Sequence, residues 1–431
     1  MLYLLRDPKD TVDILRILSY WIILLKNHME ENTTDPPEGE QKIEFVKRTA
    51  KKRTRGQEKP MEFLEWTDED ERYNRLNPFL FSPDTHWMES LYDTLYPLSK
   101  TPRFKETFFC ILTNLSLRKE AIFINLHKSA YKDTYLPPSF LPTGVSQICN
   151  DLQRNGYVVL TKGYKLPGRY GVATIIEPTE KLLSLVPPEM RYGIKEEGLV
   201  IPKEITFDTF PDSVLETRKL LSEYNMTVEP ENMLYATHKG SFEVDGRFTG
   251  SKVILMPKEE RKNIKIDGED TVELDVSNCL PFLLYADYAV SSLPKDAYDI
   301  ERYPRKLVKK ALLMALNCGS RKEAKKALQS FINYNYKGEN CELLLDKLEE
   351  EHSPVKFHFY SGIGRRLMYL ESSCMATFMR SMLDKGIKFY PIYDSVRVPV
   401  SKRDIAMEEL RKAFTIGGRE PKIHEEDGAA A

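Results

Sequence analysis

Apolar residues recur at intervals of three and four over residues 104–117 and 120–131, a spacing that predicts two helices. A third helix is expected over the segment PTGVSQICNDLQRNGYV, with its cap near Thr143. Two short runs, 157–160 and 172–176, are rich in β-branched residues and are joined by the glycine- and proline-containing turn TKGYKLPGRYG. The pattern therefore predicts three helices followed by a β-hairpin.

Three helices followed by a basic hairpin resemble a winged helix, and the expected module covers residues 103–190. In that family the third helix approaches a nucleic-acid groove, and the hairpin, or wing, contacts the backbone. The polar face of the third helix would carry Gln147, Asn150, Gln153 and Arg154. The wing would carry Lys162, Lys165 and Arg169. Nucleic-acid binding is the expected role of the module, and packing against the rest of the protein or binding a protein partner is the alternative.

An aspartate follows a predicted strand in the second half of the chain. Residues 271–276 are rich in β-branched side chains, and the apolar run 280–286 reads as a helix. Asp275 lies at the end of the strand, just before this helix. A carboxylate at a strand end is a common way to present a ligand to a metal ion.

A second aspartate lies in a predicted hairpin near the C-terminus. The runs 388–392 and 396–400 are expected to be strands, so Asp394 would lie at the turn between them. Two strand-borne aspartates, Asp275 and Asp394, can therefore meet at one site.

A helix with basic residues on its first turns is predicted between the two aspartates, in the segment YPRKLVKKALLMALNCGS. Its cations are Arg305, Lys306, Lys309 and Lys310. Cations at one end of a helix, beside two carboxylates, suit a metal-bound triphosphate.

The order of these segments resembles that of family A polymerases, which include bacterial DNA polymerase I and the single-subunit phage RNA polymerases. The segments GRFTGSKVILMP and ERKNI are similar to the part of the family that binds the primer and template strands. VELDVSN resembles the first metal motif and YDSV the last, while the segment from Arg305 resembles the nucleotide-binding helix. RLMYLESSCMATFMRSM resembles the helix before the last motif, with Glu371 in place of a glutamine. The resemblance covers about residues 245–415.

The resemblance implies two-metal phosphoryl transfer with Mg²⁺, for which Mn²⁺ can substitute. Asp275 and Asp394 would bridge both ions, and the backbone carbonyl of Val276 would complete the shell of the second ion. Lys309 or Lys310 would lie against the phosphates and protonate the leaving group, and Arg305 or Lys306 would bind the terminal phosphates. Nucleic acid would be contacted by Arg247, Arg261, Glu371 and Tyr393.

The sugar preference is left open by departures from the family. Pairing Arg305 with Lys309 puts Asn317 where the family has a tyrosine, whereas pairing Lys306 with Lys310 puts Cys318 there. Leu280 stands where members that make DNA carry a glutamate and members that make RNA carry a glycine. Neither departure distinguishes dNTPs from NTPs.

Composition and charge bear on nucleic-acid binding, on the state of the cysteines and on membrane attachment. The net charge of −2 gives no overall attraction to nucleic acid, so any binding depends on local basic patches such as the run 47–55. The six cysteines contain no CxxC pair, which indicates buried free thiols in a reducing cytoplasm. The apolar stretch 12–25 is too short for a membrane span and is expected to be an amphipathic helix.

The predicted fold class is α+β: an antiparallel polymerase palm backed by helices, with reduced helical fingers and a preceding winged-helix-like domain. The expected plan is an N-terminal helix and charged linker (1–60), a connector (61–102), the winged-helix-like module (103–190), a helical connector or reduced thumb (191–244), the palm and fingers (245–415) and a tail (416–431).

The expected function is a DNA polymerase that acts in replication or repair, with a mobile element among the expected settings, primer–template DNA and nucleoside triphosphates as partners and no membrane attachment. An RNA polymerase or primase with the same palm is one alternative. A non-catalytic nucleic-acid-binding protein with a decayed palm is the other, although two exposed acids in one cleft argue against decay.

Overall fold

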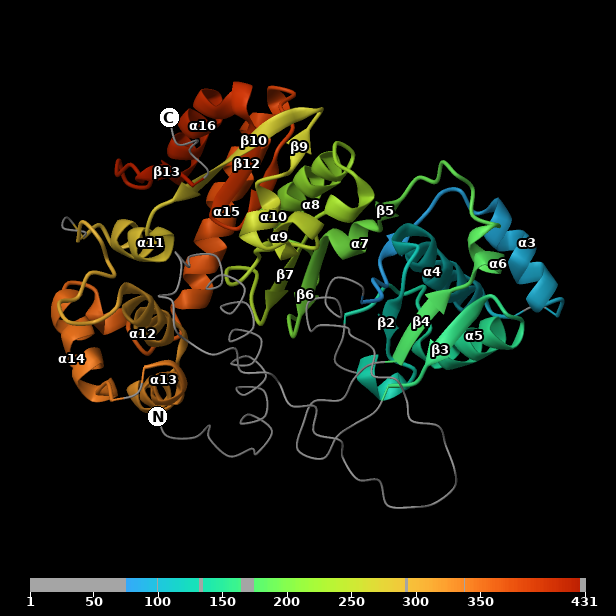
Figure 1. Ribbon diagram of the computed structural model, residues 1–431, viewed down its shortest axis with the longest axis horizontal. Coiled ribbons are helices and arrows are strands. Elements are labelled where there is room, and N and C mark those ends of the chain that lie inside the picture. The colour runs from blue at the N-terminus through green and yellow to red at the C-terminus, as the bar shows by residue number, and fades with distance from the viewer. Residues whose placement is uncertain are drawn as a thin grey trace, which may run out of the picture.

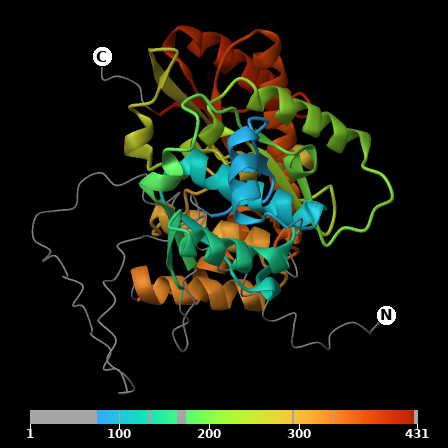
Figure 2. The same ribbon diagram turned by 90° about the vertical axis from the view of Figure 1, so that its right-hand side faces the viewer.

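The computed structural model describes residues 75–98, 100–131, 135–163, 174–290, 294–336 and 338–426. The helix expected at 12–25, the basic run 47–55 and two wing residues, Lys165 and Arg169, lie outside the described residues. Figure 1 shows an elongated molecule with residues 75–178 at one end and the helices of residues 305–351 at the other. Figure 2 views it from the end that carries residues 75–178.

The N-terminal part packs helices against a small antiparallel sheet of order β2-β4-β3. Its elements are β1 Leu80–Phe81, α3 His86–Leu95, α4 Pro102–Arg118, β2 Ile122–Ile124, η1 Lys128–Tyr131, α5 Pro142–Arg154, β3 Val158–Thr161, β4 Thr174–Pro178 and α6 Glu180–Leu183. Helix α4 begins at a capped N-terminus, where the Thr101 side chain accepts a hydrogen bond from the backbone N–H of Phe104. Helices α4 and α5 and the β3–β4 hairpin confirm three of the four elements that the spacings predicted.

The helix predicted over 120–131 is wrong. Helix α4 ends at Arg118, its C-cap residue Lys119 has a φ of 55° in the left-handed region, and strand β2 begins three residues after this cap. All three residues of β2 are buried, and Ile122 pairs with Ile176 of β4. A strand buried on both faces lacks the alternation that distinguishes it from a helix, and the β4 partner decided its conformation.

A connecting layer links this part to the large sheet. Its elements are β5 Gly193–Ile194, α7 Glu196–Leu199, β6 Val200–Lys203, α8 Asp212–Asn225, η2 Pro230–Asn232, β7 Tyr235–Lys239, β8 Phe248–Thr249, α9 Lys252–Leu255 and α10 Lys258–Arg261. Strand β7 pairs in parallel with β6 and in antiparallel fashion with β8. β5 instead pairs with β1, which joins the connecting layer to the N-terminal part.

The large sheet is antiparallel, with order β11-β12-β10-β13 and β9 paired to the start of β10. Its strands are β9 Lys265–Ile266, β10 Glu269–Val276, β11 Tyr390–Ile392, β12 Ser395–Pro399 and β13 Ile423–Glu425. The predicted strand ending in Asp275 and the hairpin around Asp394 are confirmed. Strand β13 was not predicted, because the segment after residue 415 was expected to be a tail.

Alternation along β10 gives the sheet one apolar and one polar face. Val272, Leu274 and Val276 belong to the main hydrophobic core, together with buried residues of α15 Gly364–Asp384 and α16 Arg403–Phe414. Figure 1 shows both helices beside this sheet. Thr271, Glu273 and Asp275 therefore project from the opposite face, where they are not covered by α15 and α16.

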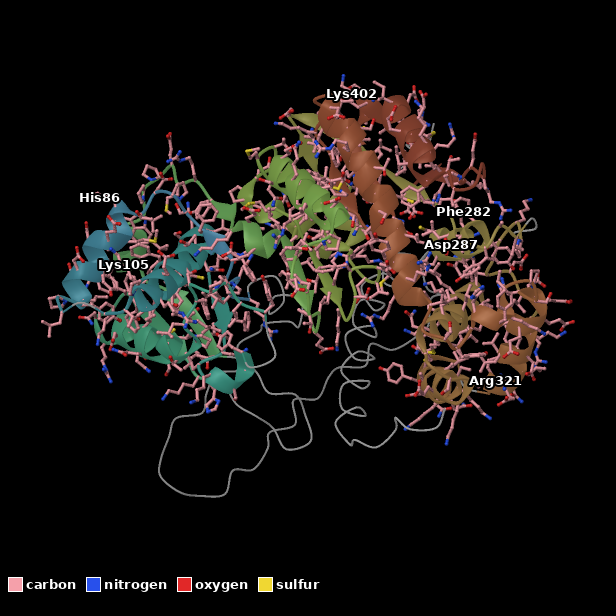
Figure 3. The ribbon with its side chains drawn as sticks, turned by 180° about the vertical axis from the view of Figure 1, so that it is seen from behind. His86, Lys105, Phe282, Asp287, Arg321 and Lys402 are labelled. Carbon is pink, nitrogen blue, oxygen red and sulfur yellow. The ribbon has the colours of Figure 1, made fainter. Side chains whose placement is uncertain are left out.

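The helical part comprises α11 Cys279–Asp287, α12 Arg305–Asn317, α13 Arg321–Asn335 and α14 Cys341–Glu351, with the short turns η3 Lys356–His358 and η4 Val400–Lys402 elsewhere in the C-terminal half. Arg321, labelled in Figure 3, fastens α13 to α14 through ion pairs with Glu342, Asp346 and Glu349. Figure 3 also shows Asp287 near one end of α15, where Arg366 binds it at 3.3 Å.

All six cysteines are free and buried, as predicted. Among the residues that the structure describes, no helix is long and apolar enough to cross a membrane.

Candidate functional site

Of the two aspartates of the sequence prediction, Asp275 lies near the end of strand β10 and Asp394 lies in the turn between β11 and β12. Asp275 pairs with Ser395 in the β10–β12 register, and the backbone N–H of Val276 donates a hydrogen bond to the carbonyl of Asp394 at 3.2 Å. Asp394 occupies a two-residue hairpin turn in which Tyr393 has a φ of 58°. The register therefore brings Asp394 next to the end of β10, on which Asp275 lies.

Asp275 is a buried acid with other acids beside it. Burial raises the pKa of Asp275 well above its ordinary value, and the negative charge of Asp394 raises it further. Glu426 acts in the same direction, whereas the positive charge of Lys309 opposes it. Clustered carboxylates are destabilised by burial and mutual repulsion, so a bound cation would stabilise this arrangement.

A second group of polar side chains surrounds Asp394. The Cys279 Sγ and the carboxylate oxygens of Glu371 and Asp394 lie within 4.8 Å of one another. Glu371 of α15 is 1% exposed and forms an ion pair with Arg247, whose guanidinium lies 5.1 Å from the centre of the Tyr393 ring. Burial also raises the pKa of the Cys279 thiol, which therefore stays protonated and is a poor ligand. Glu371 and Arg247 thus form a largely buried ion pair beside Asp394.

A tight turn positions Arg247 beside Glu371. The two preceding residues, Asp245 and Gly246, both have positive φ, 61° and 79°. A Cβ on Gly246 would lie 2.4 Å from the His238 ring, so only glycine fits there. Asp245 is held by Arg365 of α15 at 2.6 Å, which fixes the turn to the same helix that carries Glu371.

Helix α12 presents one of its two basic pairs to the acids. The Arg305 guanidinium binds Asp296 at 2.7 Å and the Asn278 side chain at 3.3 Å, and it lies 4.9 Å from the centre of the Tyr298 ring. The Lys309 ammonium lies 5.8 Å from the same ring, and its charge lowers the pKa of Asp275. Lys309 therefore faces Asp275, and Arg305, one helical turn away, lies on the same side of α12.

The other pair, Lys306 and Lys310, is rotated about 100° around the helix. Lys310 is 4% exposed, and its ammonium lies 5.3 Å from the centre of the Phe331 ring of α13. Lys306 is half-buried on the neighbouring side. The structure therefore brings Lys309, and not Lys310, toward Asp275.

Replacing Lys310 by methionine should stabilise the protein. Burial lowers the pKa of Lys310 to about 8, from an ordinary value of 10.5. The folded state therefore binds this proton less tightly than the unfolded state, and wild-type stability rises as pH increases from about 8 to 10.5. Lys310→Met should be more stable than wild type by about 1–3 kcal/mol at pH 7, a difference that shrinks through this window. Urea unfolding at pH 7 and pH 10 measures both values.

The matched control for this substitution is Lys309→Met, which removes the half-buried neighbour on the other face of α12. It should not stabilise the protein, because the charge of Lys309 favours the ionised Asp275 carboxylate. Equal effects of the two substitutions, or a difference that does not change with pH, would contradict the assignment of Lys310 to the core.

Arg261 was expected to contact nucleic acid, but its side chain is buried. It is 2% exposed and binds both carboxylate oxygens of Glu273 at 3.1 Å, while the fully buried Arg397 binds Glu273 at 3.4 Å. Ser395 also donates a hydrogen bond to Glu273 at 3.1 Å. This Arg–Glu–Arg cluster occupies the polar face of the sheet next to Asp275, so Arg261 is not on an exposed surface.

The remaining predicted residues occupy varied positions. Leu280 and Val276 are buried in the main core. The Asn317 side chain donates a hydrogen bond to the carbonyl of Leu313, and it lies against Gly364 at the start of α15. Lys162 is exposed at the end of β3. Leu280 and Asn317 thus take part in packing within the core and between helices.

The sequence did not point to four residues around the two aspartates: Lys258, Tyr298, His424 and Glu426. Tyr298 is buried, and burial followed by the charge of Asp394 raises its pKa. Burial alone raises the pKa of Glu426, but its contacts with His424 and Lys258 offset this and lower it to about 2. The segment KIHEE alternates polar and apolar residues over too few positions to indicate a strand.

Comparisons with known proteins give little further support. No family model matches the chain, and no curated protein matches it. Among solved structures, 52 chains match. One is the POL domain of Pol1 from M. smegmatis in complex with DNA primer-template and dNTP, with 11% identity and a TM-score of 0.25 over 50% of this chain and 50% of that chain. This chain thus spans about half the length of that domain, and so low a TM-score carries no argument about function.

Proposed function

We propose that this chain is a template-directed nucleotidyltransferase that extends a DNA primer by two-metal phosphoryl transfer. The proposal is supported by the proximity of Asp275, on β10, to Asp394, in the β11–β12 turn, and by Lys309 of α12, which is close enough to lower the pKa of Asp275. This combination of acids and a cation is the one that a metal-bound triphosphate requires.

The donor set fits Mg²⁺. Asp275 and Asp394 supply carboxylate oxygens, the ligands that this hard cation prefers, and the pKa of Asp275 is raised by burial and then by the neighbouring negative charges. Both aspartates would hold the ions. When bound, Mg²⁺ would lower the pKa of an attacking hydroxyl and neutralise charge on the phosphates.

Three basic residues have positions that suit the substrates. Lys309 would contact the triphosphate, and Arg305 at the first position of α12 would bind its terminal phosphates with the help of the helix N-terminus. Asp296 now pairs with Arg305, and phosphate would compete with this partly exposed carboxylate. Arg247, held by Glu371 beside Asp394, would contact the primer or template backbone.

The module of residues 103–190 is proposed to be a winged-helix-like domain that binds nucleic acid. The chain order α4, β2, η1, α5 and then the antiparallel pair β3–β4 supports this assignment, as does the exposed Lys162 directly after β3. Charge reversal of Lys162, Lys165 and Arg169 should weaken DNA binding and flatten its dependence on salt. An unchanged salt slope would favour a packing or protein-binding role.

The test of the proposed function is a primer-extension assay. Purified protein, Mg²⁺ and a labelled primer on a DNA template are combined with dNTPs or with NTPs in separate reactions. We expect extension with dNTPs. Extension with NTPs alone would identify an RNA polymerase or primase with the same site, because neither Leu280 nor Asn317 selects a sugar. No addition from either set, with Mg²⁺ or Mn²⁺, would leave a non-catalytic nucleic-acid-binding protein.

A further inference from the structure

A row of charged side chains leads from α10 to Asp275 along the C-terminal strand. Lys258 forms an ion pair with Glu426, and the Glu426 carboxylate lies 3.3 Å from Nε2 of His424. The other ring nitrogen of His424, Nδ1, lies 3.9 Å from the Asp275 carboxylate and 2.9 Å from the Ser277 hydroxyl. The imidazole thus bridges an anchored acid and an acid of the candidate metal site.

Backbone pairing fixes the position of this row. His424 is opposite Asp275 in the β10–β13 register, and the backbone N–H of Glu426 donates a hydrogen bond to the carbonyl of Glu273 at 3.0 Å. Lys258 is itself 9% exposed, so the anchor is largely shielded from water. An ionised carboxylate only accepts hydrogen bonds, so Glu426 keeps a proton on Nε2 and defines the orientation of the ring.

We propose that His424 is a positioning residue for Asp275. Glu426 and Lys258 fix the imidazole, and the imidazole with Ser277 restricts the rotation of the Asp275 side chain so that its carboxylate stays directed toward the site shared with Asp394. This inference rests on the proposed function, because it assumes that Asp275 is a metal ligand. Groups that orient a ligand in this way commonly contribute about 10–100-fold to metal affinity.

Two amide substitutions separate the two contacts of the ring. In His424→Asn the side-chain amide occupies the place of Nδ1, which keeps the contact toward Asp275 and Ser277 and loses Glu426. In His424→Gln the amide reaches the place of Nε2, which keeps Glu426 and loses Asp275. The binding of Tb³⁺, followed by its luminescence and by competition with Mg²⁺, measures the affinity of the site without any nucleotide addition.

His424→Gln should weaken Tb³⁺ binding by about 10–100-fold, and His424→Asn should stay within about threefold of wild type. The matched control is Glu425→Gln. Glu425 lies on the same strand as His424, and its substitution breaks an ion pair with Arg403 of α16 without touching the site. It should leave Tb³⁺ affinity unchanged. Melting temperatures of all variants establish that each is folded.

Equal Tb³⁺ affinities for the asparagine and glutamine variants would overturn the proposal, as would a loss in Glu425→Gln as large as that in His424→Gln. Either result would mean that β13 acts only by packing. Failure of the proposed function gives a different result: Tb³⁺ would then bind Asp275→Asn and Asp394→Asn as tightly as wild type. If Asp275→Asn and Asp394→Asn lose Tb³⁺ binding but neither His424 variant does, the positioning role of His424 is wrong and the proposed metal site is retained.

Discussion

Asp394→Asn should abolish primer extension, lowering its rate by about a thousandfold or more, while the protein stays folded and binds primer–template DNA. A neutral amide replaces a carboxylate ligand poorly, and a lost metal contact removes several kcal/mol of transition-state stabilisation, or about three orders of magnitude in rate. Nucleic acid is held mainly by basic and backbone groups elsewhere, so binding should be little affected. Asp275→Asn should behave in the same way.

The stability of these variants distinguishes a catalytic acid from a structural one. The charge of Asp394 raises the pKa of Asp275, which means that the two carboxylates repel each other in the folded protein. Removing one charge should therefore leave the melting temperature of the metal-free protein unchanged or increase it. A capping or turn aspartate would instead lose about 0.5–2 kcal/mol on substitution.

Extension rates and melting temperatures are measured together for both variants. The matched control is Asp270→Asn, which makes the same change on the same strand at an exposed position paired with Lys265. It should keep wild-type activity. Extension at the wild-type rate by Asp275→Asn and Asp394→Asn would show that neither aspartate acts in catalysis.

Glu273→Ala should destabilise the protein by about 3–5 kcal/mol, because it leaves two buried guanidinium groups without their carboxylate. Arg261 and Arg397 are 2% and 0% exposed, so water cannot replace the lost partner without opening the sheet. Urea unfolding followed by far-UV circular dichroism gives the change in the free energy of unfolding. A change below about 1 kcal/mol would mean that the cluster is more hydrated than its burial indicates.

A second variant separates the loss of charge pairing from the loss of packing. A triple variant removes all three charges and replaces them with apolar side chains of similar volume: Arg261→Met, Glu273→Leu and Arg397→Met. Such a replacement of a buried ion pair is often neutral or stabilising. The triple variant should regain most of the stability lost in Glu273→Ala. It should also bind primer–template DNA like wild type, since Arg261 is buried. If a well-folded triple variant bound DNA more weakly than wild type, Arg261 would contact nucleic acid after all.

Local sequence patterns determined the elements that carry the candidate site. β-branched residues around Asp275, the two-residue turn at Asp394 and the three- and four-residue spacing after Arg305 each specify a conformation through contacts within a few residues. For this reason the strand β10, the β11–β12 hairpin and helix α12 could be predicted from the sequence. That Asp275 and Asp394 can meet was inferred from their positions in the predicted strand and hairpin.

Other features depended on which segments cover one another in three dimensions. Residues 122–124 became a strand because β4 supplied a partner, and the basic residues of α12 separated into two pairs because α13 covers Lys310 and leaves Lys309 facing the acids. The sequence around Arg261 predicts a surface cation. In the fold, Arg261 is buried in an ion pair with Glu273, which lies twelve residues away on another element. Local propensity fixes the type of an element, whereas burial and charge pairing between distant segments fix which of its faces meets solvent, the core or the candidate site.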